Sequence, residues 1–520
     1  MKLGKAIGTI GGLTMVSRVL GFARDMMMSR ILGASAAADA FFVAFRLPNT
    51  FRRFFGEGAF SAGFVPLFSQ RYHGENGEAE AKRFSEEVLA VFLPTLVIFT
   101  LVAQVAMPAL VWLLASGYAV EPEKFHLAVD LSRITFPYLA FISLVSLYSG
   151  ILNSMHRFTA AAFAPALLNL CMLIALFFVR DGGAISATAV AWGVTAGGVL
   201  QLILLWWAAQ RAGVSLKLRR PRITPGVRQF FRVVIPATFA AGVYQLSILV
   251  DTTFISYLSE GSMAYLNYAD RLNQLPLGII GTALGTAILP SISKFVDQGQ
   301  PEEAEKIQNQ AVDLAMLLTL PAAVALAAAA VPLVTALFQG GEFSVEDARI
   351  TGQTLAIIAL GLPAYVLVKV FTPGFFARED TKTPLKVAMF VLAANIGLNF
   401  LLIPMFGIHG LATVLAITAW INGGTLYYIL RKRGHFRLSR EVGFRVGRQL
   451  IAAAAMGAVL LLIQSRLGGL YSGSVGQRLV AVGALVSAGG AVYFALGWLI
   501  GAINKDDVMV LLRRKKVSAD

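Results

Sequence analysis

The chain has 520 residues, of which 57% are hydrophobic and only 14% charged, and its mean hydropathy is +0.70. Soluble domains carry about a quarter charged residues, so this composition excludes a soluble globular protein and indicates an integral membrane protein. The net charge of +15 does not indicate nucleic-acid binding, because the basic residues fall between hydrophobic segments and not on one contiguous face. The single cysteine, Cys171, excludes an intrachain disulfide framework and a thiolate metal site.

Hydrophobic segments of about 20 residues, the length that crosses a bilayer, recur along the whole chain. They predict an all-α polytopic membrane protein with fourteen transmembrane helices, near 7–31, 36–56, 88–115, 131–152, 158–179, 185–209, 229–257, 264–290, 311–338, 351–374, 384–404, 408–430, 448–465 and 479–502. The first two are the least hydrophobic because they contain charged residues. The basic start of the chain has no small-residue cleavage site after a clean apolar core, so we expect it to be retained as the first helix.

The connecting segments alternate in their content of lysine and arginine. The segments 210–232 and 431–448 are rich in arginine, whereas 117–128 and 339–350 are short and mainly acidic. Basic residues concentrate in cytoplasmic loops. We therefore expect both the N-terminus and the C-terminus to lie in the cytoplasm.

A weak internal repeat divides the sequence into two halves. It consists of prolines, serines and asparagines that recur at nearly one spacing, namely Pro66 and Pro290, Ser69 and Ser293, Pro137 and Pro363, and Asn169 and Asn395. The repeat predicts two pseudo-symmetric six-helix bundles, 1–225 and 226–440, followed by two additional transmembrane helices and a basic tail in 441–520. Because each half has an even number of helices, the bundles enter the membrane in the same orientation, with a substrate path between them.

The segment 13–69 sets many charged groups into two otherwise apolar, helix-length stretches. They are Arg18, Arg24, Asp25, Asp39, Arg46, Arg52, Arg53 and Glu57. Ionisable side chains inside a bilayer normally face a water-filled cavity, a partner charge or a substrate. Several arginines in one cavity favour an anion, and guanidinium groups suit phosphate or pyrophosphate. The alternative is that Arg18–Asp25, Arg24–Asp39 and Arg46–Glu57 are ion pairs that hold helices together.

The spacing of these charges limits how they can meet. Arg18 and Arg24 lie about 120° apart around an ideal helix, so a straight helix cannot direct both at a narrow site. Gly21 between them is the expected hinge. In the next segment Pro48 removes a backbone hydrogen bond, and we expect it to kink that helix.

The second half carries fewer charges in its apolar stretches. Asp270 and Arg271 are adjacent, so they point about 100° apart on a helix, and we expect one of them to face the central cavity. A buried carboxylate with several neutral oxygen ligands suits a sodium ion. The candidate ligands are Asp251, Asn395, Asn399 and Thr413. Interhelical packing by the asparagines and threonines is the alternative explanation.

Enzyme motifs are absent from the sequence: there is no Walker A loop, no HExxH and no nucleophile elbow. The five histidines lie in or next to predicted loops. We therefore expect a transporter and not an enzyme, with no cofactor other than Na⁺ as a coupling ion.

Several motifs together resemble the bacterial lipid II flippases of the MurJ/MviN family, within the multidrug/oligosaccharidyl-lipid/polysaccharide exporter superfamily. They are SRVLGFARD at 17–25, DAFFVAFRLPN at 39–49, RRFFGEGAFSAGFVP at 52–66, ITFPYLAFISLVSLYSGILNSMHRFTAAAFAPALLN at 134–169 and YADRL at 268–272. The resemblance covers most of the chain and is strongest in its first half.

The resemblance implies a protein of the bacterial cytoplasmic membrane that moves undecaprenyl-pyrophosphate-linked disaccharide pentapeptide between leaflets by alternating access. Its partners would be lipid II, membrane lipids and the cell-wall synthesis machinery. The implied pyrophosphate contacts are Arg18, Arg24, Arg52 and Arg271, and the implied supporting or gating groups are Ser17, Asp39, Arg46 and Glu57, with Asp25 and Asp270 beside them. The last two helices would form the groove for the lipid tail, and Asn399 stands where the sodium site of some members is expected to have an aspartate.

Other functions fit parts of the same pattern. An exporter of another polyprenyl-linked saccharide would need the same anion-binding arginines, whereas a multidrug cation antiporter would need an acidic cavity. A membrane enzyme that acts on a prenyl phosphate would need a catalytic acid or base, for which Asp25, Asp39 and Glu57 are the available groups.

Overall fold

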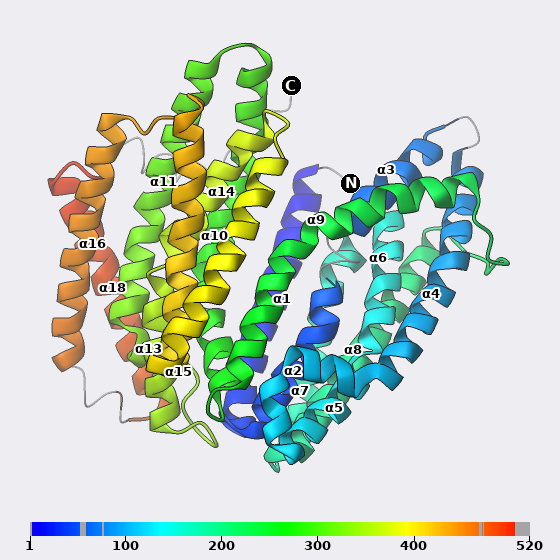
Figure 1. Ribbon diagram of the computed structural model, residues 1–520, viewed down its shortest axis with the longest axis horizontal. Helices are drawn as coiled ribbons and strands as arrows, with labels where there is room; N and C mark the ends of the chain where they lie inside the picture. The colour runs from blue at the N-terminus through cyan, green and yellow to red at the C-terminus, as the bar shows by residue number, and fades with distance from the viewer. Residues whose placement is uncertain (1–2, 53–58, 75–76, 467–470, 472, 505–520) are drawn as a thin grey trace. The chain divides into compact units, whose positions relative to one another are not determined.

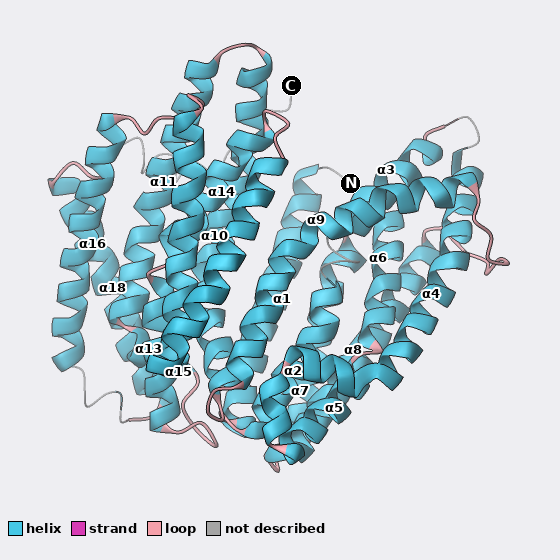
Figure 2. Cartoon of the chain, in the orientation of Figure 1, coloured by secondary structure: helices cyan, strands magenta, loops and turns pink. Residues whose placement is uncertain are grey.

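The computed structural model describes residues 3–52, 59–74, 77–466, 471 and 473–504. Within these ranges the chain is helical apart from its loops and one isolated bridge between Gly340 and Phe343 (Figures 1 and 2). The all-α expectation is therefore confirmed. The chain forms two compact units, Met1–Ala264 with Gly340–Ser344, and Tyr265–Gln339 with Val345–Asp520.

The first unit contains the helices of the first half of the chain and one more. They are α1 (Leu3–Leu32), α2 (Ala36–Arg52), α3 (Ala59–Tyr72), α4 (Gly77–Leu114), the 3-10 helix η2 (Ser116–Val120), α5 (Pro122–Thr135), α6 (Tyr138–Ser154), α7 (Thr159–Phe178), α8 (Gly183–Arg211) and α9 (Pro225–Ser256). Helical structure continues through Gly21 in α1 and through Pro48 in α2, so neither residue ends its helix. The short helix α3 was not among the expected spans.

Small residues let helices of the first unit approach closely. Helix α7 packs against both α1 and α8. A Cβ atom added at Gly197 of α8 would lie 2.9 Å from the Cα atom of Leu168 in α7, which is closer than real side chains come. The pairing of α7 with α8 therefore depends on glycine at this position.

Aromatic side chains fill the core between α3, α4 and α9. Phe60 and Phe64 of α3 are fully buried, and their rings contact those of Phe84 and Phe92 in α4 and Phe230 in α9. Ring centroids in these pairs lie 5.3–5.5 Å apart, within the range of favourable aromatic contacts. This packing fixes the start of α9 against the first turns of α3.

The second unit contains the remaining helices. They are α10 (Ser262–Asp297), whose first residues belong to the first unit, α11 (Pro301–Ala328), α12 (Ala330–Leu337), α13 (Val345–Ala359), α14 (Leu362–Phe376), α15 (Lys382–Lys432), α16 (Arg440–Arg466) and α18 (Val475–Leu499). Its core joins α14, α15 and the following loop through the rings of Phe371, Tyr427 and Phe436.

Helix α15 is two helices joined at a kink. Gly407 has φ 55° and ψ −129°, a backbone conformation that other residues adopt only at a cost. The break falls between the expected spans 384–404 and 408–430. Three expected spans are interrupted, at 136–137 between α5 and α6, at 329 between α11 and α12, and at 360–361 between α13 and α14.

Among the described residues, nine helical stretches are long and apolar enough to cross a membrane. They include α4, α7, α8, α11, α16 and α18, the pairs α5–α6 and α13–α14, and the whole of α15. Helices α1, α2, α9 and α10, which hold most of the candidate site residues, are not among these nine stretches of the described residues.

Candidate functional site

Arg24 of α1 faces α7 and is held by Asp25, Asn169 and the sulfur of Met172. Its Nε and Nη2 atoms donate to Oδ1 of Asp25 at 2.9 and 2.6 Å, and Nη1 donates to Oδ1 of Asn169 at 2.9 Å. The amide of Asn169 donates in turn to the backbone oxygen of Ser17 at 3.1 Å. The structure therefore brings Ser17, Arg24 and Asp25 together and adds Asn169, which the sequence offered only as a repeat marker.

The other arginines of the first unit differ in their surroundings. Arg18 is exposed, and within the described residues its guanidinium has no hydrogen bond or ion pair. Arg52 is partly buried and donates from Nε to Oδ1 of Asn49 at 3.0 Å. The predicted residues Arg53 and Glu57 lie outside the described residues.

Asp39 forms a buried ion pair with Lys124, a residue that the sequence interpretation missed. Its Oδ2 accepts from Lys124 Nζ at 2.9 Å and from the backbone N–H of Gly261 at 2.9 Å, and its Oδ1 accepts from the N–H of Ala264 at 3.1 Å. The side chains are 2% and 4% exposed. The sequence suggested an ion pair between Arg24 and Asp39 as one alternative. The structure instead pairs Arg24 with Asp25 and Asp39 with Lys124.

The ammonium group of Lys124 has a second contact that fixes its position. Nζ lies 4.4 Å from the centroid of the Tyr118 ring, a cation–π distance. Burial and then the negative charge of Asp39 raise the pKa of the Tyr118 hydroxyl well above its usual range. Through its own contacts, Asp39 links α2 to Lys124 at the start of α5 and to Ala264 at the start of α10.

Arg46 is directed toward helix α9. Its Nη1 donates to Oγ1 of Thr252 at 2.7 Å, and Thr252 is adjacent to the predicted sodium ligand Asp251. Asp251 is 8% exposed. Helix α2 therefore contributes a cation, Arg46, to this part of the first unit, and helix α9 contributes a carboxylate, Asp251.

Polar residues of the second unit follow a different pattern. Asp270 and Arg271 are both partly buried in α10, and Oδ2 of Asp270 accepts from Gln274 at 2.9 Å. Asn395 and Asn399 are buried one turn apart on α15, and Nδ2 of Asn399 donates to Oδ1 of Asn395 at 3.0 Å.

The remaining predicted sodium ligand, Thr413, donates to the backbone oxygen of His409 at 2.8 Å. Asp251 belongs to the first unit and the other three candidates to the second, so the sodium site stays a prediction. In the described part of the chain, no group of three or more His, Cys, Asp or Glu residues could hold a metal ion.

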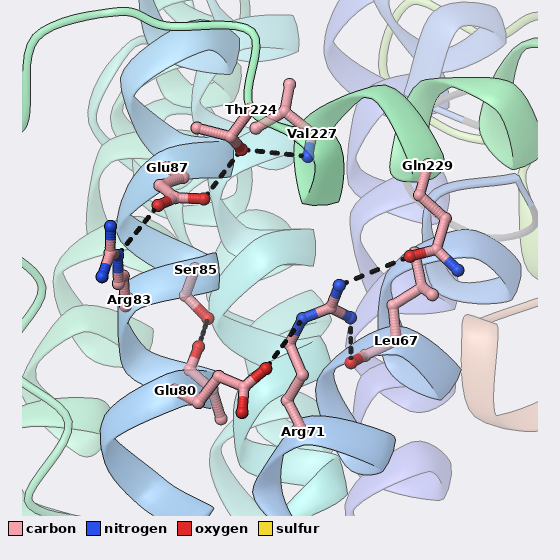
Figure 3. Close-up of polar contacts among 10 residues, drawn as sticks. Leu67, Arg71, Glu80, Arg83, Ser85, Glu87, Thr224, Val227 and Gln229 are labelled. Carbon is pink, nitrogen blue, oxygen red and sulfur yellow. Dashed lines mark hydrogen bonds and ion pairs between the residues drawn. The ribbon is translucent and has the colours of Figure 1, made fainter. Parts of the chain in front are cut away.

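The start of α9 is fastened to α3 and α4 by a polar network (Figure 3). Oγ1 of Thr224 accepts from the N–H of Val227 at 3.3 Å and donates to Glu87 at 2.8 Å. Arg71 of α3 donates to the backbone oxygen of Leu67 at 2.8 Å and to Gln229 at 3.4 Å, as the close-up shows. The arginine-rich loop before α9 therefore has a defined attachment to its own unit.

The fold of this chain is similar to that of helical transporters of known structure. It matches the solved structure described as lipid II flippase MurJ in an inward closed conformation with TM-score 0.79 and 24% identity, covering 94% of this chain and 98% of that one. An inward-facing multidrug resistance MATE family transporter of the MOP superfamily matches with TM-score 0.66 and 16% identity, covering 82% of this chain and 98% of that chain. Both likenesses identify the transporter fold.

The sequence comparisons identify the family. The family model described as lipid II flippase MurJ matches residues 28–480. A probable lipid II flippase MurJ of Rhizobium tropici is 42% identical, over 99% of this chain and 98% of its own length. A lipid II flippase MurJ of Burkholderia cenocepacia is 35% identical, over 96% of this chain and 98% of its own length. The chain belongs to the MurJ lipid II flippase family.

Proposed function

We propose that this protein is a lipid II flippase that moves the undecaprenyl-pyrophosphate-linked peptidoglycan precursor from the inner to the outer leaflet. The observation that carries the proposal is membership of the MurJ family over residues 28–480, together with relatives of that name at 42% identity. The protein is a multi-pass inner-membrane protein. Its MATE-like fold is consistent with transport by alternating access.

The charged groups of α1 support a role in binding the pyrophosphate. Arg24 uses Nε and Nη2 on Asp25 and Nη1 on Asn169, so its plane is already oriented when an anion arrives. Arg18, six residues earlier, is exposed and has no partner among the described residues. A pyrophosphate would therefore meet one free guanidinium and one that is preorganised, which reduces the ordering cost of binding. Arg52 and Arg271 complete the proposed set of contacts.

In this proposal the supporting groups link helices and so hold them in position. Asp39 links α2 to Lys124 and to the first residues of α10, and Arg46 links α2 to α9. Asp25, Ser17 and Asp270 hold or border the arginines, and we keep Glu57 as a gating residue on the strength of its motif alone. These links would break and re-form as the transporter changes conformation.

The topology that we propose has fourteen membrane helices with both termini in the cytoplasm, arranged as two six-helix bundles and two additional helices. Helices α1, α2, α9 and α10 complete the proposed count, since each covers a span that the sequence predicts. The two halves of α15 count separately because Gly407 divides them. Helices α16 and α18 pack against each other and would form the groove for the prenyl tail.

We propose separately that a sodium gradient drives transport. Asp251, Asn395, Asn399 and Thr413 supply the oxygen ligands that sodium prefers, and membrane potential is the alternative driving force. We propose no catalytic step: the protein would translocate lipid II without changing it. Cell-wall synthesis proteins remain proposed partners.

The test is a flipping assay in proteoliposomes that contain lipid II and an outside probe for its headgroup. The wild-type protein should expose inner-leaflet lipid II to the probe and leave it chemically unchanged. Arg24→Ala and Arg271→Ala should lose flipping, and each should fail to complement a strain depleted of its own flippase at normal protein levels. Asn169→Ala is the matched control: it frees Nη1 of Arg24 but keeps the charge, so it should retain measurable flipping.

Two outcomes would overturn the proposal. Full complementation by Arg24→Ala and Arg271→Ala would remove their role in substrate binding. Conversion of lipid II into another compound by the purified protein would favour a membrane enzyme.

A further inference from the structure

We propose that a cavity between the end of α15 and the start of α16 binds the phosphate-bearing headgroup of an anionic phospholipid. The cavity has a volume of about 650 Å³. Three arginines and two aromatic side chains line it, together with small and apolar residues of the intervening loop: Tyr427, Arg431, Arg437, Leu438, Ser439, Arg440, Gly443 and Phe444. All of these residues belong to the second unit, and none has a place in the proposed lipid II site.

The three arginines carry positive charge that no carboxylate of the described residues neutralises. Within the described residues, Arg431, Arg437 and Arg440 form no ion pair. Two neighbouring arginines behave differently: Arg433 pairs with Asp380 at 2.6 Å and Arg445 with Asp313 at 2.8 Å. The cavity is therefore lined by the guanidinium groups of this region that lack a carboxylate, which favours an anionic ligand.

The backbone that presents these arginines is held in place. Asn309 of α11 is 7% exposed, accepts from the N–H of Ser439 at 2.8 Å and donates to the backbone oxygen of Arg437 at 2.9 Å. The ring of Phe436 is fully buried. The guanidinium carbon of Arg440 lies 5.5 Å from the centroid of the Phe444 ring. A ligand would thus meet a positioned set of cations, which lowers the ordering cost of binding.

The location of the cavity favours a membrane lipid over a dissolved anion as its ligand. Helices α15 and α16 are both apolar enough to cross a membrane, and the cavity lies where one ends and the other begins. Exposed apolar side chains continue from it along these helices, including Tyr428, Phe444 and Ile451 at 62%, 60% and 63% exposure. Phe444 and Ile451 are seven residues apart and share one face of α16.

This arrangement matches the two parts of an anionic phospholipid. The phosphodiester would accept bidentate hydrogen bonds from the guanidinium groups, and the acyl chains would cover the exposed face of α16. Basic pockets between membrane helices on the cytoplasmic side are known to bind such headgroups. The ligand is therefore an anionic phospholipid of the leaflet that this loop contacts.

The experiment titrates the purified full-length protein with phosphatidylglycerol or phosphatidylethanolamine and counts bound lipids by native mass spectrometry. The wild-type protein should prefer phosphatidylglycerol. The variant Arg431→Gln/Arg437→Gln/Arg440→Gln should lose affinity by about five-fold for each arginine, the usual effect of one basic residue at an anionic surface. The control Arg220→Gln/Arg222→Gln/Arg228→Gln removes the same charge from exposed arginines of the first unit and should change affinity less than about two-fold.

A second variant tests the cavity without changing the charge. A Cβ atom added at Gly443 would meet only Leu438 Cδ2, at 4.0 Å, so the side chain of Gly443→Leu can enter the cavity. Leucine also favours helix over glycine, so the substitution should not unfold α16. It should lower phosphatidylglycerol affinity by at least about five-fold, the value of one lost arginine contact.

Three results would overturn the proposal. Equal losses in the cavity variant and the charge-matched control would show general surface attraction, and unchanged binding in Gly443→Leu would show that the cavity is not the site. Displacement of phosphatidylglycerol by millimolar inorganic phosphate would assign the cavity to a free anion. No lipid II is present in this assay, so its outcome is independent of the flipping activity.

Discussion

Each unit of the molecule contains a carboxylate inside an apolar helical region, and the two are stabilised to different degrees. Asp39 of the first unit pairs with Lys124, and their side chains are 2% and 4% exposed. Asp313 of the second unit pairs with Arg445, and these side chains are 11% and 24% exposed. Each carboxylate also accepts from neutral donors, two backbone N–H groups for Asp39 and the amide of Gln449 for Asp313.

The difference between the pairs shows what burial adds to an ion pair. Removing one partner of a buried pair leaves an uncompensated charge, whereas an exposed partner is replaced by water. The Arg24–Asp25 pair lies between the two, with side chains 11% and 8% exposed. The three pairs therefore form a series in which the cost of substitution should fall as exposure rises.

The largest effect is expected for Lys124→Met. The substitution leaves Asp39 charged and buried with only two backbone donors, which should destabilise the folded protein by about 3–5 kcal/mol. The measurement is the apparent melting temperature of the purified protein in a fixed detergent, together with its level in the membrane. Adding Asp39→Asn should recover part of the loss, because the double variant no longer buries a charge. A melting temperature equal to that of the wild type would show that the pair does not stabilise the fold.

A smaller loss should follow Asp25→Asn. The change removes the charge that accepts two N–H groups of Arg24 but leaves the bond to Asn169, so we expect about 2 kcal/mol. The same melting assay applies, and Arg18→Gln serves as the matched control because Arg18 is exposed. A loss as large as that of Lys124→Met would contradict the series.

The sequence predicted the helices well because the bilayer imposes a simple length and hydropathy rule. The expected spans fall on helices throughout the described residues, including both halves of α15. The interruptions at 136–137, 329 and 360–361 and the short helix α3 were not predicted. Aromatic contacts stabilise helix α3, stacked with a ring of α4 and edge-to-face with a ring of α9.

The candidate site was predicted by residue type but not by pairing. The charged motif of α1 and α2 supplied the candidate residues, whose roles stay predictions, and the structure brings Ser17, Arg24 and Asp25 together. Asp39 was assigned no lysine partner, because Lys124 lies in a connecting segment that was counted only for topology. No periodicity relates the two residues, so only the tertiary structure reveals their contact.

The third prediction extends the series to the second unit. Arg445→Gln should cost about 1 kcal/mol, because Arg445 is partly exposed and Gln449 still donates to Asp313. The melting assay should rank this variant above both Asp25→Asn and Lys124→Met in stability. Raising the salt concentration should reduce the difference between Arg445→Gln and the wild type but should not change the effect of Lys124→Met. Equal salt dependence in the two variants would show that exposure does not set their difference.

The smallest effect concerns a loop of the second unit, where a histidine lies among arginines. Burial lowers the pKa of His435 below its usual value of 6.5, and the charges of Arg378 and Arg433 lower it further. The unfolded chain therefore binds a proton more readily than the folded one, so stability present above about pH 6.5 is lost as the pH falls through the lowered pKa. Between pH 7.5 and pH 5 the apparent melting temperature of the wild type should fall on the order of 1 °C more than that of His435→Asn. A pH-dependent decrease in His435→Asn as large as that of the wild type would place the titrating group elsewhere in the chain.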